Sequence, residues 1–260
     1  MKIVVCIKQV PNTTQVKLDP ETGTLIRKGV PSIINPDDKA GLEAALRMKD
    51  QYGATVQVVS MGPPQADLAL REALAMGADE AVLITDRAFG GADTWATSST
   101  LASAIRMLGY DLIITGRQAI DGDTAQVGPQ IAEHLKIVNI SYAEDIKLVG
   151  DSIVVKRQYE DRYHMIKAKL PCLITALSEL NEPRYMTAAG IFNAYREKEV
   201  RILTRMDLDV EDGNIGLKGS PTRVVKSFTK EAKGQGTVVT LDTQESVAWI
   251  IEKLEEKFVL

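Results

Sequence analysis

Short apolar runs alternate with amphipathic stretches through the first half of the chain. The apolar runs have the length of buried strands and lie at residues 3–8, 56–60, 81–85 and 112–115. Apolar positions with helical spacing follow at residues 37–49, 64–76, 94–108 and 124–135. This alternation predicts an α/β fold, in which a parallel sheet carries helices on both faces. Right-handed crossovers would make the sheet doubly wound.

Further along the chain the pattern becomes that of an antiparallel sheet. Residues 146–160 and 163–177 alternate or carry β-branched side chains, and a Gly150-Asp151 turn separates two strand candidates. We expect these strands to extend the mostly parallel sheet as antiparallel edge strands. A short helix is predicted at residues 187–196.

The C-terminal part of the chain has a different composition. Residues 205–237 are rich in Gly, Pro, Lys and Asp, so we expect them to be disordered or to lie on a partner. Residues 242–258 have the pattern of an amphipathic helix. The expected organisation is an α/β domain over residues 1–204 and a C-terminal arm with a helix over residues 205–260.

Composition and charge exclude several classes of protein. The chain has 260 residues and is 45% hydrophobic, enough for a sizeable core. A net charge of −4 without a Lys/Arg block argues against nucleic acid and anionic membranes. No window approaches the roughly 20 apolar residues of a membrane span, and the N-terminus resembles a strand rather than a signal peptide. Cys6 and Cys172 are isolated in apolar runs, which indicates reduced cysteines in a cytoplasmic protein, and no metal-ligand spacing surrounds His134 or His164.

The strongest candidate site is the stretch 111–130, which reads DLIITGRQAIDGDTAQVGPQ. An apolar strand ends at Gly116, a polar loop follows, and a helix begins. A helix that opens after such a loop can hold a phosphate, because its first N–H groups are free and its dipole contributes about 0.3–1 kcal/mol. Asp121 and Asp123 would repel that anion, so we expect them to form turns, cap the helix or accept ligand hydroxyls. Arg117 is either a phosphate clamp or a partner of these two acids.

Two more loops, 61–64 and 86–93, are expected at the same carboxyl ends of the strands as this loop. In the second of them, Gly90-Gly91 would let the backbone approach a ligand closely. Arg87 could pair with a phosphate. The alternative is a flexible surface loop in which Asp93 caps the next helix.

Several blocks of the sequence resemble, in the same order, those of electron transfer flavoprotein beta subunits. They are VVCIKQVPNTT at 4–14, NPDDKAGLEAAL at 35–46, SMGPPQA at 60–66, ALAMGADEA at 73–81, GRQAIDGDTAQVGPQIAEHL at 116–135 and LNEPRY at 180–185. The resemblance covers essentially the whole chain. It implies a fold similar to that of adenine-nucleotide alpha hydrolases, pairing with an alpha subunit, and a C-terminal segment that reaches across that partner.

One block resembles the motif of the electron-bifurcating subgroup, namely DRAFGGADTWATSS at 86–99. In ordinary members of the family the beta subunit holds AMP as a structural nucleotide. In the bifurcating subgroup the same pocket holds FAD, which accepts a hydride from NADH. One electron then passes through the alpha-bound FAD to an acyl-CoA dehydrogenase, such as butyryl-CoA dehydrogenase, and the other passes to ferredoxin or flavodoxin.

The resemblance also implies the residues of the site. Those expected to contact FAD are Cys6, Asn35, Asp38, Met61, Gly116, Arg117, Gln118, Ala119, Ile120, Asp121, Gly122, Thr124, Ala125, Gln126 and Val127. Those expected near NADH and the flavin ring are Arg87, Phe89, Gly90, Gly91, Ala92, Asp93, Thr94 and Thr97. No protein side chain is expected to be catalytic, because the flavin carries the chemistry. Oxidoreductase activity is therefore expected only in the complex with the alpha subunit and the dehydrogenase.

The family's docking segment for the dehydrogenase corresponds to residues 187–195. Many members have a large apolar anchor there, but this chain has Ala188 at that position. Met186, Ile191 or Phe192 would then supply the anchor. A buried amphipathic helix is the alternative.

Two other functions remain open from the sequence. One is the ordinary electron carrier, with structural AMP and no NADH oxidation, which the 86–97 block disfavours. The other is a nucleotide-hydrolysing enzyme on a similar fold. Such an enzyme should have a Gly-rich loop after the first strand or a GxxxxGK[ST] motif, whereas residues 9–16 hold no glycine and that motif is absent.

Overall fold

The computed structural model describes residues 1–12, 31–222, 225 and 236–259. The chain divides into two compact units, Met1–Val224 and Val225–Leu260. Predictions that fall on residues 13–30, and on much of the proposed arm, lie outside the described residues.

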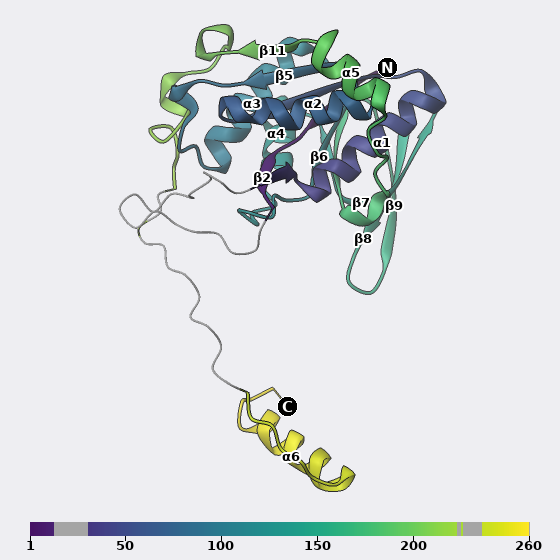
Figure 1. The fold of residues 1–260 in the computed structure, drawn as a ribbon, viewed down its shortest axis with the longest axis vertical. Helices are drawn as coiled ribbons and strands as arrows, with labels where there is room; N and C mark the ends of the chain where they lie inside the picture. Colours follow the sequence, from purple (N-terminus) through teal and green to yellow (C-terminus); the bar gives the residue numbers. More distant parts are fainter. Residues whose placement is uncertain (13–30, 223–224, 226–235, 260) are drawn as a thin grey trace. The chain divides into compact units, whose positions relative to one another are not determined.

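The first unit is built on a nine-stranded sheet (Figure 1). Its strands are β1 (Lys2–Cys6), β4 (Thr55–Met61), β5 (Glu80–Ile84), β6 (Leu112–Gly116), β7 (Val138–Val149), β8 (Ser152–Gln158), β9 (Tyr163–Lys169), β10 (Cys172–Ala176) and β11 (Val200–Leu203). Their spatial order is β11-β5-β4-β1-β6-β10-β7-β8-β9. Neighbours from β11 to β7 pair in parallel, and β7, β8 and β9 pair antiparallel. A separate antiparallel pair joins β2 (Gln9–Pro11) to β3 (Ser32–Ile34).

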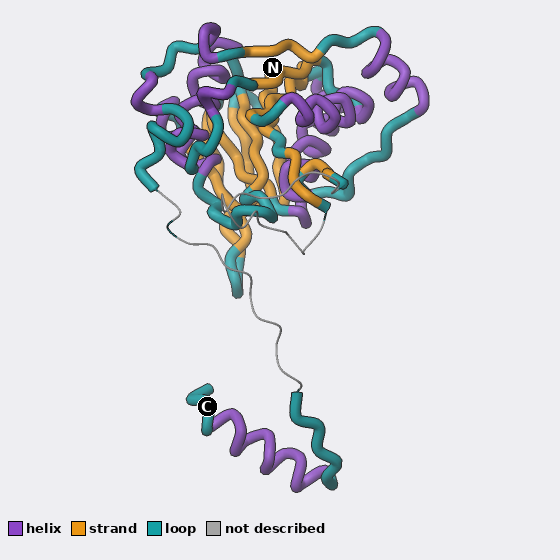
Figure 2. Tube along the Cα trace, turned by 60° about the vertical axis from the view of Figure 1, so that its left-hand side comes forward, coloured by secondary structure: helices purple, strands orange, loops and turns teal. Residues whose placement is uncertain are grey.

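Helices cover both faces of the sheet, as Figure 2 shows. They are α1 (Pro36–Tyr52), α2 (Asp67–Met76), α3 (Thr94–Leu108), α4 (Val127–Leu135) and α5 (Ala188–Arg196). Apolar side chains of α1 and α2, such as Leu42 and Leu70, join one buried cluster with the strands. Those of α3 and α4, such as Ile105 and Ile131, join the cluster on the other face. The predicted α/β fold, a mostly parallel sheet with antiparallel strands at one edge, is confirmed.

Three details differ from the prediction. β10 was expected among the antiparallel edge strands, but it lies inside the sheet and pairs in parallel with both β6 and β7. β11 was not predicted, because its four residues are too short to show a period. Helix α4 begins later than residue 124, since Asp123 and Ala125 have φ values of 49° and 53°, which a right-handed helix excludes.

Residues 205–222 lie in the first unit rather than beginning a separate arm. They form two short 3-10 helices, Arg205–Asp207 and Asp212–Asn214. Leu208 and Ile215 are each 5% exposed and belong to the apolar cluster under α3 and α4. The observed division of the chain at Val224 therefore differs from the predicted boundary at residue 204.

The second unit contains helix α6 (Thr243–Glu255). Asp242 caps it by accepting a hydrogen bond from the N–H of Glu245 at 2.9 Å. The apolar side chains of Val247, Ile250 and Ile251 are exposed within this chain. Among the described residues, no helix combines the length and the apolar character needed to cross a membrane.

Candidate functional site

The candidate site lies where the winding of the sheet reverses. From β1 the chain proceeds through β4 to β5 on one side, and it then returns to place β6 on the other side of β1. The switch point is therefore between β1 and β6, and ligands of such sheets bind outside the carboxyl ends of the strands at that point. Residue Gly116 ends β6 there, and the loop to α4 follows it.

The carboxylate of Asp38 spans this switch point. It accepts hydrogen bonds from the N–H of Lys8, just after β1, at 2.8 Å and from the N–H of Gly116 at 2.9 Å. Asp38 is 7% exposed, and its burial raises the pKa to about 7 despite these donors. A buried carboxylate therefore joins the ends of the two strands that flank the ligand crevice.

Asp37, the neighbouring acid, binds a third strand end. Its Oδ1 accepts the N–H of Ser178, which follows β10, at 3.1 Å, and its Oδ2 lies 3.4 Å from Nε of Arg117. Both acids lie inside the first turn of helix α1, and Asn35 is its N-cap residue. Of the two alternatives for Arg117, the ion pair with Asp121 or Asp123 is not observed, because Arg117 pairs with Asp37.

Asn35 holds the loop after β6 through both ends of its side-chain amide. Its Nδ2 donates to the carbonyl oxygen of Gln118 at 2.8 Å, and its Oδ1 accepts the N–H of Ile120 at 3.1 Å. Asn35 is completely buried, so its side chain shapes the loop. Asp121 forms an ion pair with Lys8 at 2.6 Å, in keeping with the expectation that it does not face a phosphate.

The start of helix α4 has no side-chain cap. Of the three roles expected for Asp123, capping is not the one observed, because the N-cap residue is Gln126 and Asp123 accepts a hydrogen bond from Gln118 Nε2 at 3.0 Å. The first N–H groups of an α-helix have no partner within the helix. An uncapped start beside a switch point is suited to an anionic group such as a phosphate.

The second loop is joined to the first by a side-chain contact. Thr94 Oγ1 donates to Gln126 Oε1 at 2.8 Å, so the starts of α3 and α4 lie side by side. The cap that the alternative interpretation of this loop included is present, since Asp93 Oδ1 accepts the N–H of Ala96 at 3.0 Å. Thr97 lies one turn further along α3 and is half-buried. The two loops predicted to bind one cofactor therefore border a single region.

Apolar side chains from β1, from the end of β4 and from the 86–93 loop pack together next to these two loops; we call them the apolar floor. Cys6 and Phe89 are 9% and 5% exposed and belong to one buried cluster, against which Met61 packs. The pKa of the Cys6 thiol is raised to about 12 by burial and by the nearby Asp38, which indicates an unreactive packing residue. Arg87, Gly90 and Gly91 are exposed on the same loop.

One residue of the region carried no signal in the sequence. Ser60, near the carboxyl end of β4, is 1% exposed, and its hydroxyl has no hydrogen-bond partner among the described residues. Buried hydroxyls normally have a partner. A serine inside an apolar strand is commonplace, so only the structure distinguishes this one.

His134, by contrast, has partners. Its Nε2 lies 3.1 Å from Ser98 Oγ, and the ring of Trp95 meets its ring edge-on at 4.8 Å. Burial, followed by the nearby cations, lowers the pKa of His134. Both rings therefore pack between α3 and α4, as expected for a satisfied histidine. Among the described residues, no group of His, Cys, Asp and Glu could hold a metal ion.

The predicted docking residues lie on and beside α5. Met186, Ile191 and Phe192 are 43%, 42% and 59% exposed, and Ala188 is also exposed. Ala194 alone is buried among the residues of this helix. In this chain the helix thus presents apolar side chains to solvent, in contrast to the alternative of a buried amphipathic helix.

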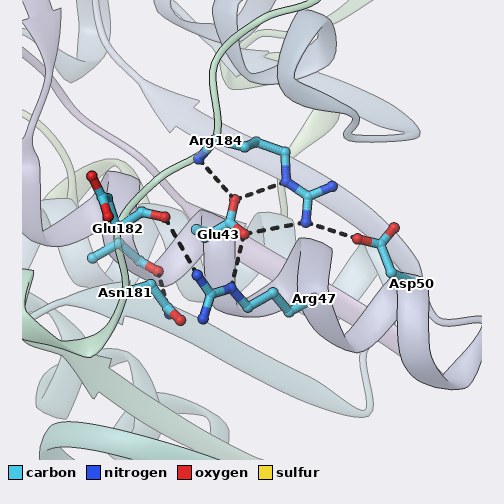
Figure 3. A network of polar contacts seen from close by, with 7 residues as sticks. Glu43, Arg47, Asp50, Asn181, Glu182 and Arg184 are labelled. Carbon is cyan, nitrogen blue, oxygen red and sulfur yellow. Dashed lines mark hydrogen bonds and ion pairs between the residues drawn. The ribbon is translucent and has the colours of Figure 1, made fainter.

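The segment that leads to this helix is fixed by a buried acid (Figure 3). Glu43 of α1 is 3% exposed and accepts from the backbone N–H of Arg184 at 3.1 Å and from its Nε at 2.8 Å. Arg47 Nε also donates to it, at 2.9 Å. Burial alone would raise the pKa of Glu43, but these hydrogen bonds hold it below its usual value. Arg184 Nη2 additionally donates to Asp50 Oδ2 at 2.8 Å, so the Nε and Nη2 groups of its guanidinium both bind acids of α1.

Together, a doubly wound sheet and a Gly-containing loop at its switch point define an α/β protein of the class that binds nucleotides at strand ends. A model of the electron transfer flavoprotein domain matches residues 22–203. The chain is 60% identical over 257 residues to the electron transfer flavoprotein subunit beta of Clostridium acetobutylicum, with 99% of each chain covered. It is 54% identical over 263 residues to the caffeyl-CoA reductase-Etf complex subunit CarD of Acetobacterium woodii, with 100% of each covered. It is 48% identical over 269 residues to the acryloyl-CoA reductase electron transfer subunit gamma of Anaerotignum propionicum, again with 100% of each covered.

The chain belongs to the electron transfer flavoprotein family, and its role is that of the beta subunit in electron transfer. The resemblance identified from the sequence blocks is thereby confirmed. Members of this family are flavoproteins.

The Asp38 carboxyl predicts a pH-dependent stability. Its pKa is raised to about 7 in the folded chain, so the folded state holds a proton that the unfolded state releases near pH 4. The contribution of Asp38 to stability is therefore largest below about pH 4 and declines as the pH rises towards 7. Asp38→Asn removes this titration and should flatten the change in unfolding free energy between pH 5 and pH 8. Urea denaturation at several pH values measures it, with the exposed Asp161→Asn as control; an unchanged profile in Asp38→Asn would contradict the assignment.

Gly116 should tolerate no side chain. A Cβ atom there would lie 2.2 Å from Asp38 Oδ1 and 2.8 Å from the Asp38 backbone nitrogen. Gly116→Ala should therefore lower the unfolding free energy by about 1–3 kcal/mol, the usual cost of overpacking. Gly122 is the matched control in the same loop, since a Cβ atom there meets nothing within 4 Å. Equal stability of the two variants in thermal or urea unfolding would refute the close contact.

Arg184→Ala should destabilise the chain more than Arg47→Ala. The first change removes the Nε and Nη2 donors of Arg184 from the buried Glu43, leaves only the backbone N–H and Arg47, and should cost about 1–3 kcal/mol. The second removes a side chain that is 55% exposed, which should cost less than about 1 kcal/mol. Urea denaturation of both variants tests the ranking, and a larger loss for Arg47→Ala would reverse our interpretation of the network.

Proposed function

We propose that this chain is the FAD-binding beta subunit of an electron-bifurcating flavoprotein. In this proposal its FAD accepts a hydride from NADH. One electron passes through the FAD of the alpha subunit to an acyl-CoA dehydrogenase such as butyryl-CoA dehydrogenase, and the other passes to ferredoxin or flavodoxin. The observation that carries the proposal is the hydrogen bond between Thr94 and Gln126, at 2.8 Å. It joins the 86–97 loop to the loop between β6 and α4, which we expect to hold the phosphates.

The residues at the switch point fit a dinucleotide. The uncapped start of α4 offers backbone N–H groups for a pyrophosphate. The loop that precedes it is fixed by the hydrogen bond from Asn35 to Gln118. Cys6 and Met61 contribute to an apolar floor suited to an adenine or flavin ring. Ser60 supplies a buried hydroxyl without a partner among the described residues, as a ligand contact would require.

The 86–97 loop favours FAD over structural AMP. AMP needs only the loop between β6 and α4, for its phosphate, and a pocket for its adenine. A second loop with an exposed arginine, Arg87, and exposed Gly90 and Gly91 has no role around AMP alone. Around FAD it can approach the ring, where Arg87 would stabilise negative charge on the reduced flavin.

The flavin would supply hydride acceptance and one-electron transfer. The chain's own residues would bind and orient it. Thr94 and the start of α4 would hold the phosphates, and the backbone at Gly90 and Gly91 would sit near the ring. No side chain is assigned a proton-transfer step.

Beta subunits of this family pair with an alpha subunit, and two relatives carry the names of acyl-CoA reductase systems. We assign dehydrogenase docking to the exposed apolar residues at Met186, Ile191 and Phe192. We assign α6 and the residues before it to contact with the alpha subunit. The location proposed for the complex is the cytoplasm.

The cofactor content of the purified alpha–beta heterodimer tests the proposal. We expect two FAD molecules per heterodimer, and we expect NADH to bleach the absorbance of the beta-bound flavin. Arg87→Ala should slow this reduction by roughly 10- to 100-fold, as expected for loss of one charge-assisted contact. Arg162→Ala, an exposed arginine on the β8–β9 hairpin, is the matched control and should change nothing.

One FAD and one AMP per heterodimer, with no response to NADH, would instead establish the ordinary electron carrier. Turnover of ATP by the isolated chain would favour a nucleotide-hydrolysing enzyme.

A further inference from the structure

Residues 205–222 close over the 86–93 loop and are bound to both of its ends. At one end, Asp86 Oδ2 accepts the N–H of Arg205 at 3.1 Å. At the other end, Asp93 Oδ2 accepts the N–H of Thr222 at 3.0 Å and its hydroxyl at 2.8 Å. We call residues 205–222 the strap.

The middle of the strap packs directly on the loop backbone. The N–H of Leu217 donates to the carbonyl oxygen of Gly90 at 3.0 Å, and a Cβ atom on Gly91 would lie 3.1 Å from Leu217 Cβ. Gly216 has φ 56°, and a Cβ atom there would lie 2.0 Å from the carbonyl oxygen of Ala88. Only glycine fits at such a position. The strap is therefore in van der Waals contact with the turn that carries the two loop glycines.

Asp93 is the point where the strap, the loop and helix α3 meet. Its Oδ1 accepts the N–H of Ala96 at the start of α3, while its Oδ2 is used by Thr222. Its own N–H donates to Ser220 Oγ at 2.8 Å, and that hydroxyl in turn donates to the carbonyl oxygen of Gly216 at 2.7 Å. Burial alone would raise the pKa of Asp93, but the donors from Ala96 and Thr222 hold it below its usual value. The acid thus remains ionised, and charge-assisted hydrogen bonds are the stronger kind.

We propose that Thr222 and Ser220 of the strap are positioning residues for the 86–93 loop, acting through Asp93. The relation to the flavin ring rests on the proposed function, whereas the fixing of the loop does not.

Hydrogen exchange of the heterodimer, followed by mass spectrometry, tests the fixing of the loop. Thr222→Val removes the hydroxyl with little change in shape, and Ser220→Ala removes the acceptor for the Asp93 N–H. In both variants, peptides covering residues 86–97 should exchange roughly three- to ten-fold faster, while peptides of the sheet keep their rates. Thr222→Ser should restore the wild-type rate, and Thr55→Val, an exposed threonine in β4, should have no effect. Unchanged loop exchange in both variants would overturn the proposal.

NADH kinetics of the same variants test the link to the flavin. In a heterodimer that oxidises NADH, Thr222→Val should raise KM for NADH by roughly the same factor with a smaller change in kcat, and Thr222→Ser should reverse this. A faster-exchanging loop with an unaltered KM would overturn the positioning role in the reaction. If the wild-type heterodimer does not oxidise NADH, the proposed function fails, and the exchange rates alone decide whether the strap fixes the loop.

Discussion

The carboxylate of Asp38 bridges the two strands on either side of the switch point, and the geometry of the candidate site depends on it. Parallel strands end without a turn to hold their last N–H groups together. Here one buried carboxylate accepts the N–H groups of Lys8 and Gly116, at 2.8 and 2.9 Å. Burial makes that carboxylate unfavourable when ionised, as its pKa of about 7 indicates. Burial of this carboxylate therefore lowers the stability of the fold, whereas its two hydrogen bonds fix the separation between the strand ends.

Helix α1, which carries Asp38, holds distant segments of the chain through two further buried acids. Asp37 holds the chain after β10 through Ser178, and Glu43 holds the segment before α5 through Arg184. Each acid is at least nine-tenths buried, and each binds a segment far away in the sequence. Helix α1 therefore serves as the common support for the crevice and for the approach to the exposed α5 helix. Since buried acids with backbone donors have one satisfactory arrangement, the support is rigid.

Local information in the sequence was sufficient for most of the fold but for little of this support. The apolar runs located β1, β4, β5 and β6, and the Asp93 cap followed from its position before an apolar period. The insertion of β10 beside β6 was missed, because Cys172 pairs with Leu112 across a long stretch of chain. The partners of the α1 acids were missed for the same reason. Their spacing in NPDD is typical of a helix cap, and only tertiary packing directs them to other strands.

Two segments that lead towards exposed apolar helices, α5 and α6, are each held by one carboxylate. The segment before α5 is held by Glu43, and the connection that continues towards α6 is held at Thr222 by Asp93. In both cases a carboxylate that belongs to a core helix or caps one binds a backbone N–H of the segment. A loosely attached surface loses entropy when it docks, so a defined attachment point lowers the cost of docking. Asp93 differs from Glu43 in one respect, because the same side chain also caps α3 and thereby ties the 86–93 loop to that helix.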